Sequence, residues 1–143
     1  MKTALLEAKA ALDAGDVPVG AVVVHEGKII AKAHNERERL CDPTAHAEVL
    51  ALRRAAKILG RRRLSDCQLY VTLEPCPMCA GTIIMADVGS VYYGAADETA
   101  GCAGSVYALP EDPAFGKKIP CMGGLMEDDC KEILDTFFEE KRV

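Results

Sequence analysis

The stretch QLYVTLEPCPMCA, residues 68–80, joins a predicted strand to a predicted helix. Its first half is rich in β-branched and aromatic residues, which favour a strand over residues 68–73. The Glu-Pro pair that follows ends the strand, and a helix is expected over residues 76–86. Cys76 and Cys79 lie three residues apart at the start of this helix, so both thiols can point to one side. Because a helix N-terminus favours anions, it also favours the thiolate form that binds metals.

A second motif, His46-Ala47-Glu48, supplies the groups that two cysteines lack. The histidine falls in the first turn of another expected helix, so two facing helix starts would bring one imidazole and two thiolates around a single zinc ion. Three protein ligands leave a fourth position for water, whose pKa zinc lowers from about 16 to about 7. Glu48 points in another direction and is the expected proton carrier. The alternative is a structural site closed by Cys41 or Cys102, which leaves Glu48 without a task.

Outward from these motifs, helices and strands alternate along the chain. A hairpin is expected near the N-terminus, with strands over residues 21–24 and 28–33 joined by a tight turn. The other expected elements are helices over 2–14, 42–59 and from 127 onward, strands over 90–94 and 118–122, a loop over 35–42, and an irregular segment with one helical turn over 95–117. This order predicts an α/β fold of three layers, α/β/α, with a mixed sheet flanked by helices.

The composition narrows the class of protein. With 143 residues, half of them apolar, the chain fits a single domain over residues 1–143. No stretch is apolar enough to cross a membrane and the N-terminus lacks a signal-peptide pattern, so we expect a cytoplasmic protein. Seven cysteines, an odd number, argue against a secreted disulfide framework. The net charge of −5 argues against a generally basic nucleic-acid binder but leaves room for a local basic patch.

Together, H-x-E and P-C-x-x-C form the signature of the zinc-dependent nucleobase deaminases. The runs DPTAHAE at 42–48, LYVTLEPCPMCAG at 69–81 and VPVGAV at 17–22 resemble those of the bacterial tRNA adenosine deaminases, within the cytidine/deoxycytidylate deaminase superfamily. The resemblance extends over nearly the whole chain. It implies a zinc-dependent hydrolase that converts the wobble adenosine of tRNA to inosine.

The resemblance also implies a cytidine deaminase-like fold with five strands, a homodimer whose interface lies near the active sites, and the tRNA anticodon stem-loop as partner. Asn35 would hydrogen-bond the flipped nucleoside, and Asp97 would lie near the substrate backbone. The residues themselves leave alternatives, because Asn35 could cap a turn and Asp97 is a common type of turn residue. The catalytic residue would be Glu48, beside one Zn²⁺ per chain bound by His46, Cys76 and Cys79.

Some positions depart from the family pattern. The loop after the fourth strand has Ala96, Glu98 and Thr99 where family members carry Arg and Lys, which normally contact phosphate. This motivates an alternative substrate for the same chemistry, a free base or nucleoside of the guanine, cytosine or cytidine type; a further alternative is a non-catalytic, zinc-stabilised binding module. One basic stretch forms either a phosphate-binding stripe or a solvated helix face: Arg53, Arg54, Lys57, Arg61, Arg62 and Arg63.

Overall fold

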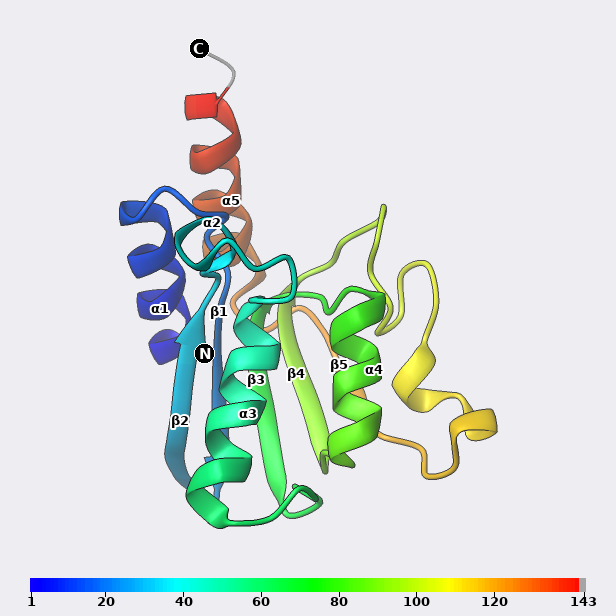
Figure 1. Cartoon of the computed structure of the whole chain (residues 1–143). Coiled ribbons are helices and arrows are strands. Elements are labelled where there is room, and N and C mark those ends of the chain that lie inside the picture. Colours follow the sequence, from blue (N-terminus) through cyan, green and yellow to red (C-terminus); the bar gives the residue numbers. More distant parts are fainter. Residues whose placement is uncertain (142–143) are drawn as a thin grey trace.

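A single five-stranded sheet, in the order β2-β1-β3-β4-β5, organises the computed structural model, which describes residues 1–141 (Figure 1). Its strands are Gly20–His25 (β1), Lys28–His34 (β2), Cys67–Leu73 (β3), Ser90–Ala95 (β4) and Cys121–Met122 (β5). β1 pairs antiparallel with β2 and with β3, whereas β3, β4 and β5 run parallel. The predicted mixed sheet is confirmed, and its parallel half has the carboxyl ends of the strands at one edge.

Helices cover both faces of the sheet. They are Lys2–Asp13 (α1), Arg37–Leu40 (α2), Ala47–Leu59 (α3), Pro77–Ala86 (α4) and Glu127–Lys141 (α5). Figure 1 shows α3 and α4 in front of the strands, with α1 and α5 on the other side. This arrangement confirms the predicted three-layer α/β/α architecture. Among the described residues, every helix is too short or too polar to cross a bilayer.

Small residues allow α1 to pack closely against the sheet. Ala4, Ala8 and Ala11 recur at helical spacing and are fully buried. A Cβ atom at Gly20 of β1 would lie 1.9 Å from the carbonyl oxygen of Ala4, so only glycine fits at this contact. Small and aliphatic side chains therefore provide most of the packing at this contact, in a chain that has no Trp.

The predicted start of α3 is wrong. The sequence placed it at Asp42, but the helix begins at Ala47 and His46 is its N-cap. Asp42 forms a local turn instead, because its Oδ1 accepts hydrogen bonds from the backbone N–H of Thr44 (2.8 Å) and from the Thr44 hydroxyl (2.7 Å). The metal-ligand candidate thus lies just before the helix rather than inside its first turn.

Two shorter segments also differ from expectation. The loop predicted over residues 35–42 contains α2, a single helical turn that lacks the apolar periodicity needed to detect it. The strand predicted over 118–122 is limited to Cys121–Met122, and the irregular segment holds two 3₁₀ turns, Leu109–Glu111 and Pro113–Phe115, rather than one helical turn. Neither difference moves the residues of the predicted site.

Candidate metal centre and its pocket

Three predicted ligands converge where two helices begin. His46 is the N-cap of α3 and Cys76 is the N-cap of α4, while Cys79 lies in the first turn of α4. The Nδ1 atom of His46 lies 3.6 Å from the Cys76 Sγ and 3.5 Å from the Cys79 Sγ. All three donor atoms lie within 4.8 Å of one another, the one such group of three or more possible ligands among residues 1–141. The two sequence motifs are therefore brought together as predicted.

The spacing of these donors fits a tetrahedral ion. Zinc bonds of about 2.3 Å to sulfur and about 2.0 Å to nitrogen, at tetrahedral angles, place a nitrogen and a sulfur about 3.5 Å apart. Neither proposed fourth ligand joins the group: the Cys41 thiol is exposed and donates to the Glu38 carbonyl, and the Cys102 thiol donates to the Ala100 carbonyl. In the described part of the chain, the cluster thus has the three-ligand composition of a catalytic metal centre.

The two thiols of the cluster have opposite protonation preferences. A hydrogen bond from Cys79, supported by His46, lowers the pKa of Cys76 to about 4. The same hydrogen bond and burial raise the pKa of Cys79. Hydrogen bonding to Cys76 raises the pKa of His46. The helix start therefore favours the thiolate form of Cys76, the form that binds a cation.

Glu48 is a buried carboxyl group beside the cluster. It lies in the first turn of α3 and is 3% exposed. Burial raises its pKa, which favours the protonated carboxyl group and suits a residue that must hold and return a proton. A cavity of about 200 Å³ opens onto it. The polar groups that line this cavity are those of Asn35, Arg37, His46, Glu48, Glu74, Cys76 and Asp97.

The two residues predicted to contact substrate also border this cavity. Asn35 is buried; its amide Nδ2 donates to the Val17 carbonyl (3.1 Å), and its Oδ1 accepts from the backbone N–H of Ala47 (2.9 Å). Its side chain therefore caps the start of α3. Asp97 accepts hydrogen bonds at Oδ1 from the backbone and hydroxyl of Thr99 (3.0 and 2.8 Å), which is the turn arrangement considered as its alternative.

Comparisons with known proteins agree with this geometry. The MafB19-like deaminase family model matches residues 1–142. The tRNA-specific adenosine deaminase of Bacillus subtilis is 46% identical over 142 residues, which cover 99% of this chain and 88% of that protein. The chain belongs to the tRNA-specific adenosine deaminase family. Another relative with the same name, from Aquifex aeolicus, is 42% identical over 99% of this chain and 93% of its own length.

Solved structures place this deaminase among similar folds. One, from a study of A-to-I editing by tRNA:A34 deaminases at the wobble position, has a TM-score of 0.90 and 42% identity and covers 94% of this chain and 97% of its own. A guanine deaminase from Bacillus subtilis is 47% identical, with a TM-score of 0.63, over 66% of this chain and 61% of its own. The cytidine deaminase-like fold implied by the sequence is thus confirmed.

Glu74 is a residue of this deaminase whose importance the sequence analysis missed. Its buried carboxylate accepts hydrogen bonds from the backbone N–H groups of Asp97 (3.1 Å), Ala103 (3.0 Å) and Ser105 (2.9 Å), and from the Ser105 hydroxyl. A Cβ atom at Gly101 would lie 2.4 Å from the Glu74 carboxyl carbon, so the loop also needs glycine there. Glu74 therefore fastens the loop that forms one wall of the cavity. The position of Glu74, a charged residue directly after an apolar strand, was the sequence feature that could have indicated this role.

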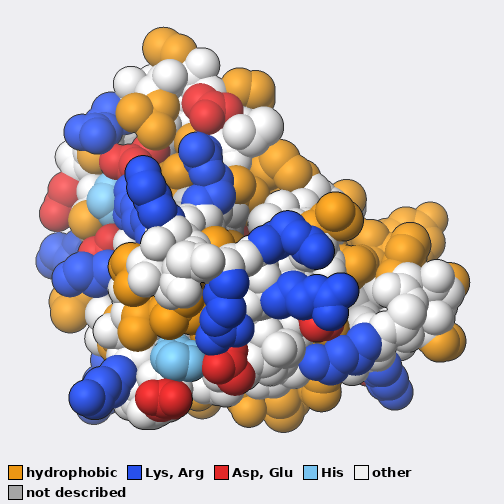
Figure 2. All heavy atoms as spheres, turned by 60° about the horizontal axis from the view of Figure 1, so that its bottom comes forward, with side chains coloured by type: hydrophobic (Ala, Val, Ile, Leu, Met, Phe, Trp, Pro, Cys, Tyr) orange, Lys and Arg blue, Asp and Glu red, His pale blue; other side chains and the backbone are white. Residues whose placement is uncertain are grey.

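The basic stretch of this deaminase is exposed but partly engaged within the chain. Figure 2 shows Lys and Arg side chains gathered on the face that carries the lower end of the molecule in Figure 1. Arg54 donates to the carbonyl of Lys32 (2.7 Å), Arg61 pairs with Asp66 (2.7 Å), and Arg62 donates to the Met85 carbonyl (3.0 Å). Half of the stretch thus has partners expected of a solvated helix face.

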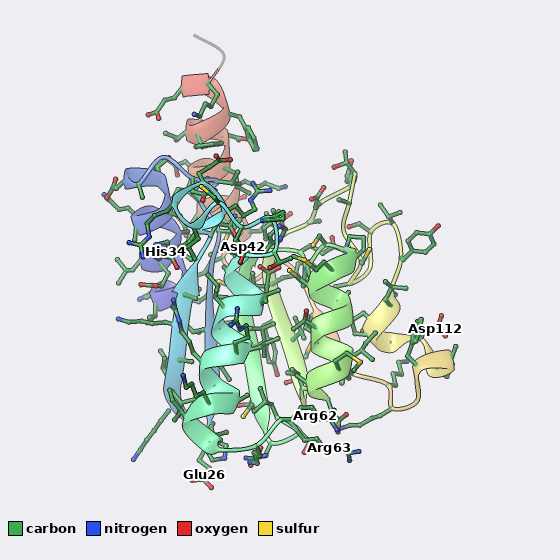
Figure 3. The ribbon with its side chains drawn as sticks, in the orientation of Figure 1. Glu26, His34, Asp42, Arg62, Arg63 and Asp112 are labelled. Carbon is green, nitrogen blue, oxygen red and sulfur yellow. The ribbon has the colours of Figure 1, made fainter. Side chains whose placement is uncertain are left out.

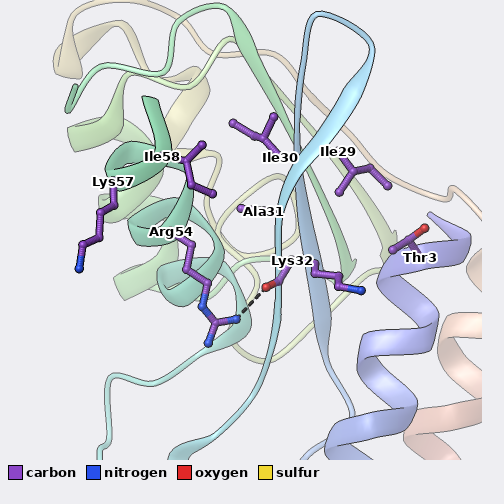
Figure 4. Close-up of a pocket in the computed structure, with 8 residues that line it drawn as sticks. All are labelled: Thr3, Ile29, Ile30, Ala31, Lys32, Arg54, Lys57 and Ile58. Atoms are coloured by element: carbon purple, nitrogen blue, oxygen red, sulfur yellow. Dashed lines mark hydrogen bonds between the residues drawn. The ribbon is translucent and has the colours of Figure 1, made fainter. Parts of the chain in front are cut away.

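A cavity larger than the one beside Glu48 lies away from the metal centre of this deaminase. It measures about 680 Å³ and is bounded by β2, α3 and the start of α1 (Figure 4). Its walls are isoleucine side chains and the stems of Lys32, Arg54 and Lys57. None of the described residues that line it carries a thiol, an imidazole or a carboxylate, so size alone does not identify the reactive site in this fold.

Proposed function

We propose that this protein hydrolytically deaminates the wobble adenosine of tRNA to inosine. The main support is that one imidazole and two thiols converge beside a buried carboxyl group, in a chain of the tRNA-specific adenosine deaminase family. His46, Cys76 and Cys79 would hold one Zn²⁺ per chain. Zinc bound there supplies a site at which water becomes nucleophilic near neutral pH.

The remaining chemistry belongs to the chain's own residues. Glu48 accepts a proton from the attacking water and delivers it to the ring nitrogen next to C6 of adenine. It then takes the remaining proton from the oxygen now bound to C6 and gives it to the exocyclic amino group, which leaves as ammonia while that oxygen stays on C6. The burial that raises the pKa of Glu48 suits both steps, since the group must gain and lose a proton in each turnover. The anticodon nucleotide would be turned out of its stack into the cavity.

Asn35 and Asp97 are the proposed substrate contacts. The Asn35 amide retains one N–H and one lone pair beyond its two intrachain hydrogen bonds, enough to bind a nucleoside hydroxyl or base edge. Asp97 borders the cavity from the loop held by Glu74. Both assignments predict changes in KM for RNA when the side chains are removed.

We propose further that a single catalytic domain over residues 1–143 works as a cytoplasmic homodimer. The exposed apolar side chain of Met85, near the C-terminal end of α4, offers a surface for a second copy. Sedimentation of the purified protein tests this arrangement. A monomer at micromolar concentration would contradict it.

Incubation with an arginine-tRNA anticodon stem-loop, and separately with free bases and nucleosides, tests the substrate. The expected result is inosine at the wobble position without turnover of free guanine, cytosine or cytidine. The similarity to a guanine deaminase structure favours a free base as the second candidate. Turnover of guanine with an unchanged stem-loop would contradict the tRNA function and support that candidate.

A further inference from the structure

Arg37 is a half-buried cation with an unsatisfied N–H group within the described part of the chain. It begins α2, and its side chain lines the cavity that contains Glu48. Its Nε atom is buried and has no hydrogen-bond acceptor among the described residues. Its neighbours differ: Arg39 and Arg54 both reach the carboxylate of Glu36, at 3.2 and 3.6 Å.

Arg37 shares the cavity with three carboxyl groups, those of Glu48, Glu74 and Asp97. It is the one Lys or Arg among the residues that line the cavity. The Glu74 carboxylate is occupied by four hydrogen bonds from the 97–105 loop, and Asp97 is occupied by its own turn. A buried N–H group without an acceptor costs free energy, so its persistence requires a reason. A ligand that accepts hydrogen bonds from Arg37 would provide one.

We infer that Arg37 binds a phosphate of the RNA strand on either side of the nucleotide in the cavity, an inference that rests on the proposed function. The planar guanidinium presents Nε and Nη as a fork that matches two phosphate oxygens. In a polynucleotide every base has flanking phosphates, so a base seated against Glu48 places a phosphodiester at the cavity wall. The loop over residues 96–105, which lines the cavity through Asp97 and Ala100, contains no Lys or Arg.

The test uses three variants of the full, zinc-loaded protein. Arg37→Gln removes the charge but keeps hydrogen-bonding capacity, and Arg37→Lys keeps the charge without the fork. Arg39→Gln is the matched control, because Arg39 lies on the same helical turn with its side chain 68% exposed. Deamination of the anticodon stem-loop is measured at several salt concentrations, together with zinc content and the thermal midpoint of each variant.

Arg37→Gln is expected to raise KM for the stem-loop at least about tenfold and to leave kcat within about threefold. The slope of log(kcat/KM) against log salt should fall by about one in this variant but not in Arg37→Lys or Arg39→Gln. An unchanged KM and slope in Arg37→Gln, with an active parent protein, overturns this inference alone. A parent protein that forms no inosine in the stem-loop overturns the proposed function and this inference together. If Arg37→Gln loses zinc or stability, the Arg37→Lys variant tests the inference instead. A KM equal to that of the parent protein in Arg37→Lys would contradict binding of phosphate by the guanidinium fork.

Discussion

The two ends of β3 both hold ionisable groups with shifted pKa values, but they handle charge differently. At the amino end, Asp66 pairs with Arg61 (2.7 Å) and His25 (2.9 Å) on the surface, and these partners lower its pKa to about 2. At the carboxyl end, Cys76 has its pKa lowered to about 4 beside Glu48, whose pKa burial raises. In Figure 3, Glu26, Arg62 and Arg63 mark the first end, and Asp42 marks the second.

The comparison teaches that a shifted pKa does not by itself identify a reactive site. Exposed ion pairs shift pKa values at little gain in stability, because water screens them. Glu48 and Glu74 are withdrawn from water, which is costly unless each group has a partner or a task. Glu74 accepts four hydrogen bonds from the 97–105 loop, whereas the carboxyl group of Glu48 faces the Cys79 thiol of the metal-ligand cluster. The carboxyl end of β3 is therefore distinguished by a buried carboxyl group, that of Glu48, which lies beside the metal-ligand cluster and is free to exchange a proton.

The largest effect is expected from replacing the buried carboxyl group of Glu48. Glu48→Gln should lower kcat for the stem-loop by about 10²–10⁴-fold, because the amide cannot carry a proton. Zinc content should stay at one per chain, since Glu48 is not among the three donors of the cluster. The assay is single-turnover inosine formation with metal analysis of the same sample.

The matched control for Glu48→Gln is Glu26→Gln, at the hairpin tip near the other end of β3. Glu26 is exposed, and its change should leave turnover as in the parent protein. If Glu48→Gln stays active, or if both variants lose activity equally, the contrast between the two ends fails.

The second effect concerns metal retention. Cys79→Ser should reduce bound zinc and deamination together, because a hydroxyl replaces a thiolate that zinc prefers. Cys67→Ser at the opposite end is the comparison: its thiol is also buried but lies outside the metal-ligand cluster. Metal analysis after dialysis against a chelator distinguishes the two. Equal zinc in both variants would remove Cys79 from the centre.

The third effect concerns the wall of the cavity. Glu74→Gln should lower the free energy of unfolding by about 1–3 kcal/mol, because its new NH₂ group faces N–H donors of the 97–105 loop. KM for the stem-loop should rise as the loop loosens, while zinc content stays unchanged. Urea unfolding and kinetics measure these effects. Parental stability would show that the loop does not depend on the carboxylate.

Local patterns predicted the sheet, the main helices and the metal cluster because each depends on neighbours in sequence. β-branched runs gave the strands, and the two motifs carried all three donors. The start of α3 could not be predicted, because its first N–H is capped by Asn35 from 12 residues away. Glu74 was missed for the same reason: its partners lie 23 to 31 residues later, where only the folded loop brings them.

The smallest effect should come from the exposed pair at the amino end of β3. The pKa of Asp66 is lowered from 3.8 to about 2 in the folded protein, so its carboxylate stabilises the fold above about pH 4 and this contribution disappears as pH falls towards 2. Asp66→Asn should therefore reduce stability slightly at pH 7, less so in high salt, and the difference from the parent should vanish near pH 2. Thermal unfolding at several pH values measures this change, and deamination should be unaffected because the residue lies at the end of β3 away from the cavity. Loss of deamination at parental stability would mean that the surface charges at this end also serve the reaction, and the distinction between buried and exposed groups would have to be abandoned.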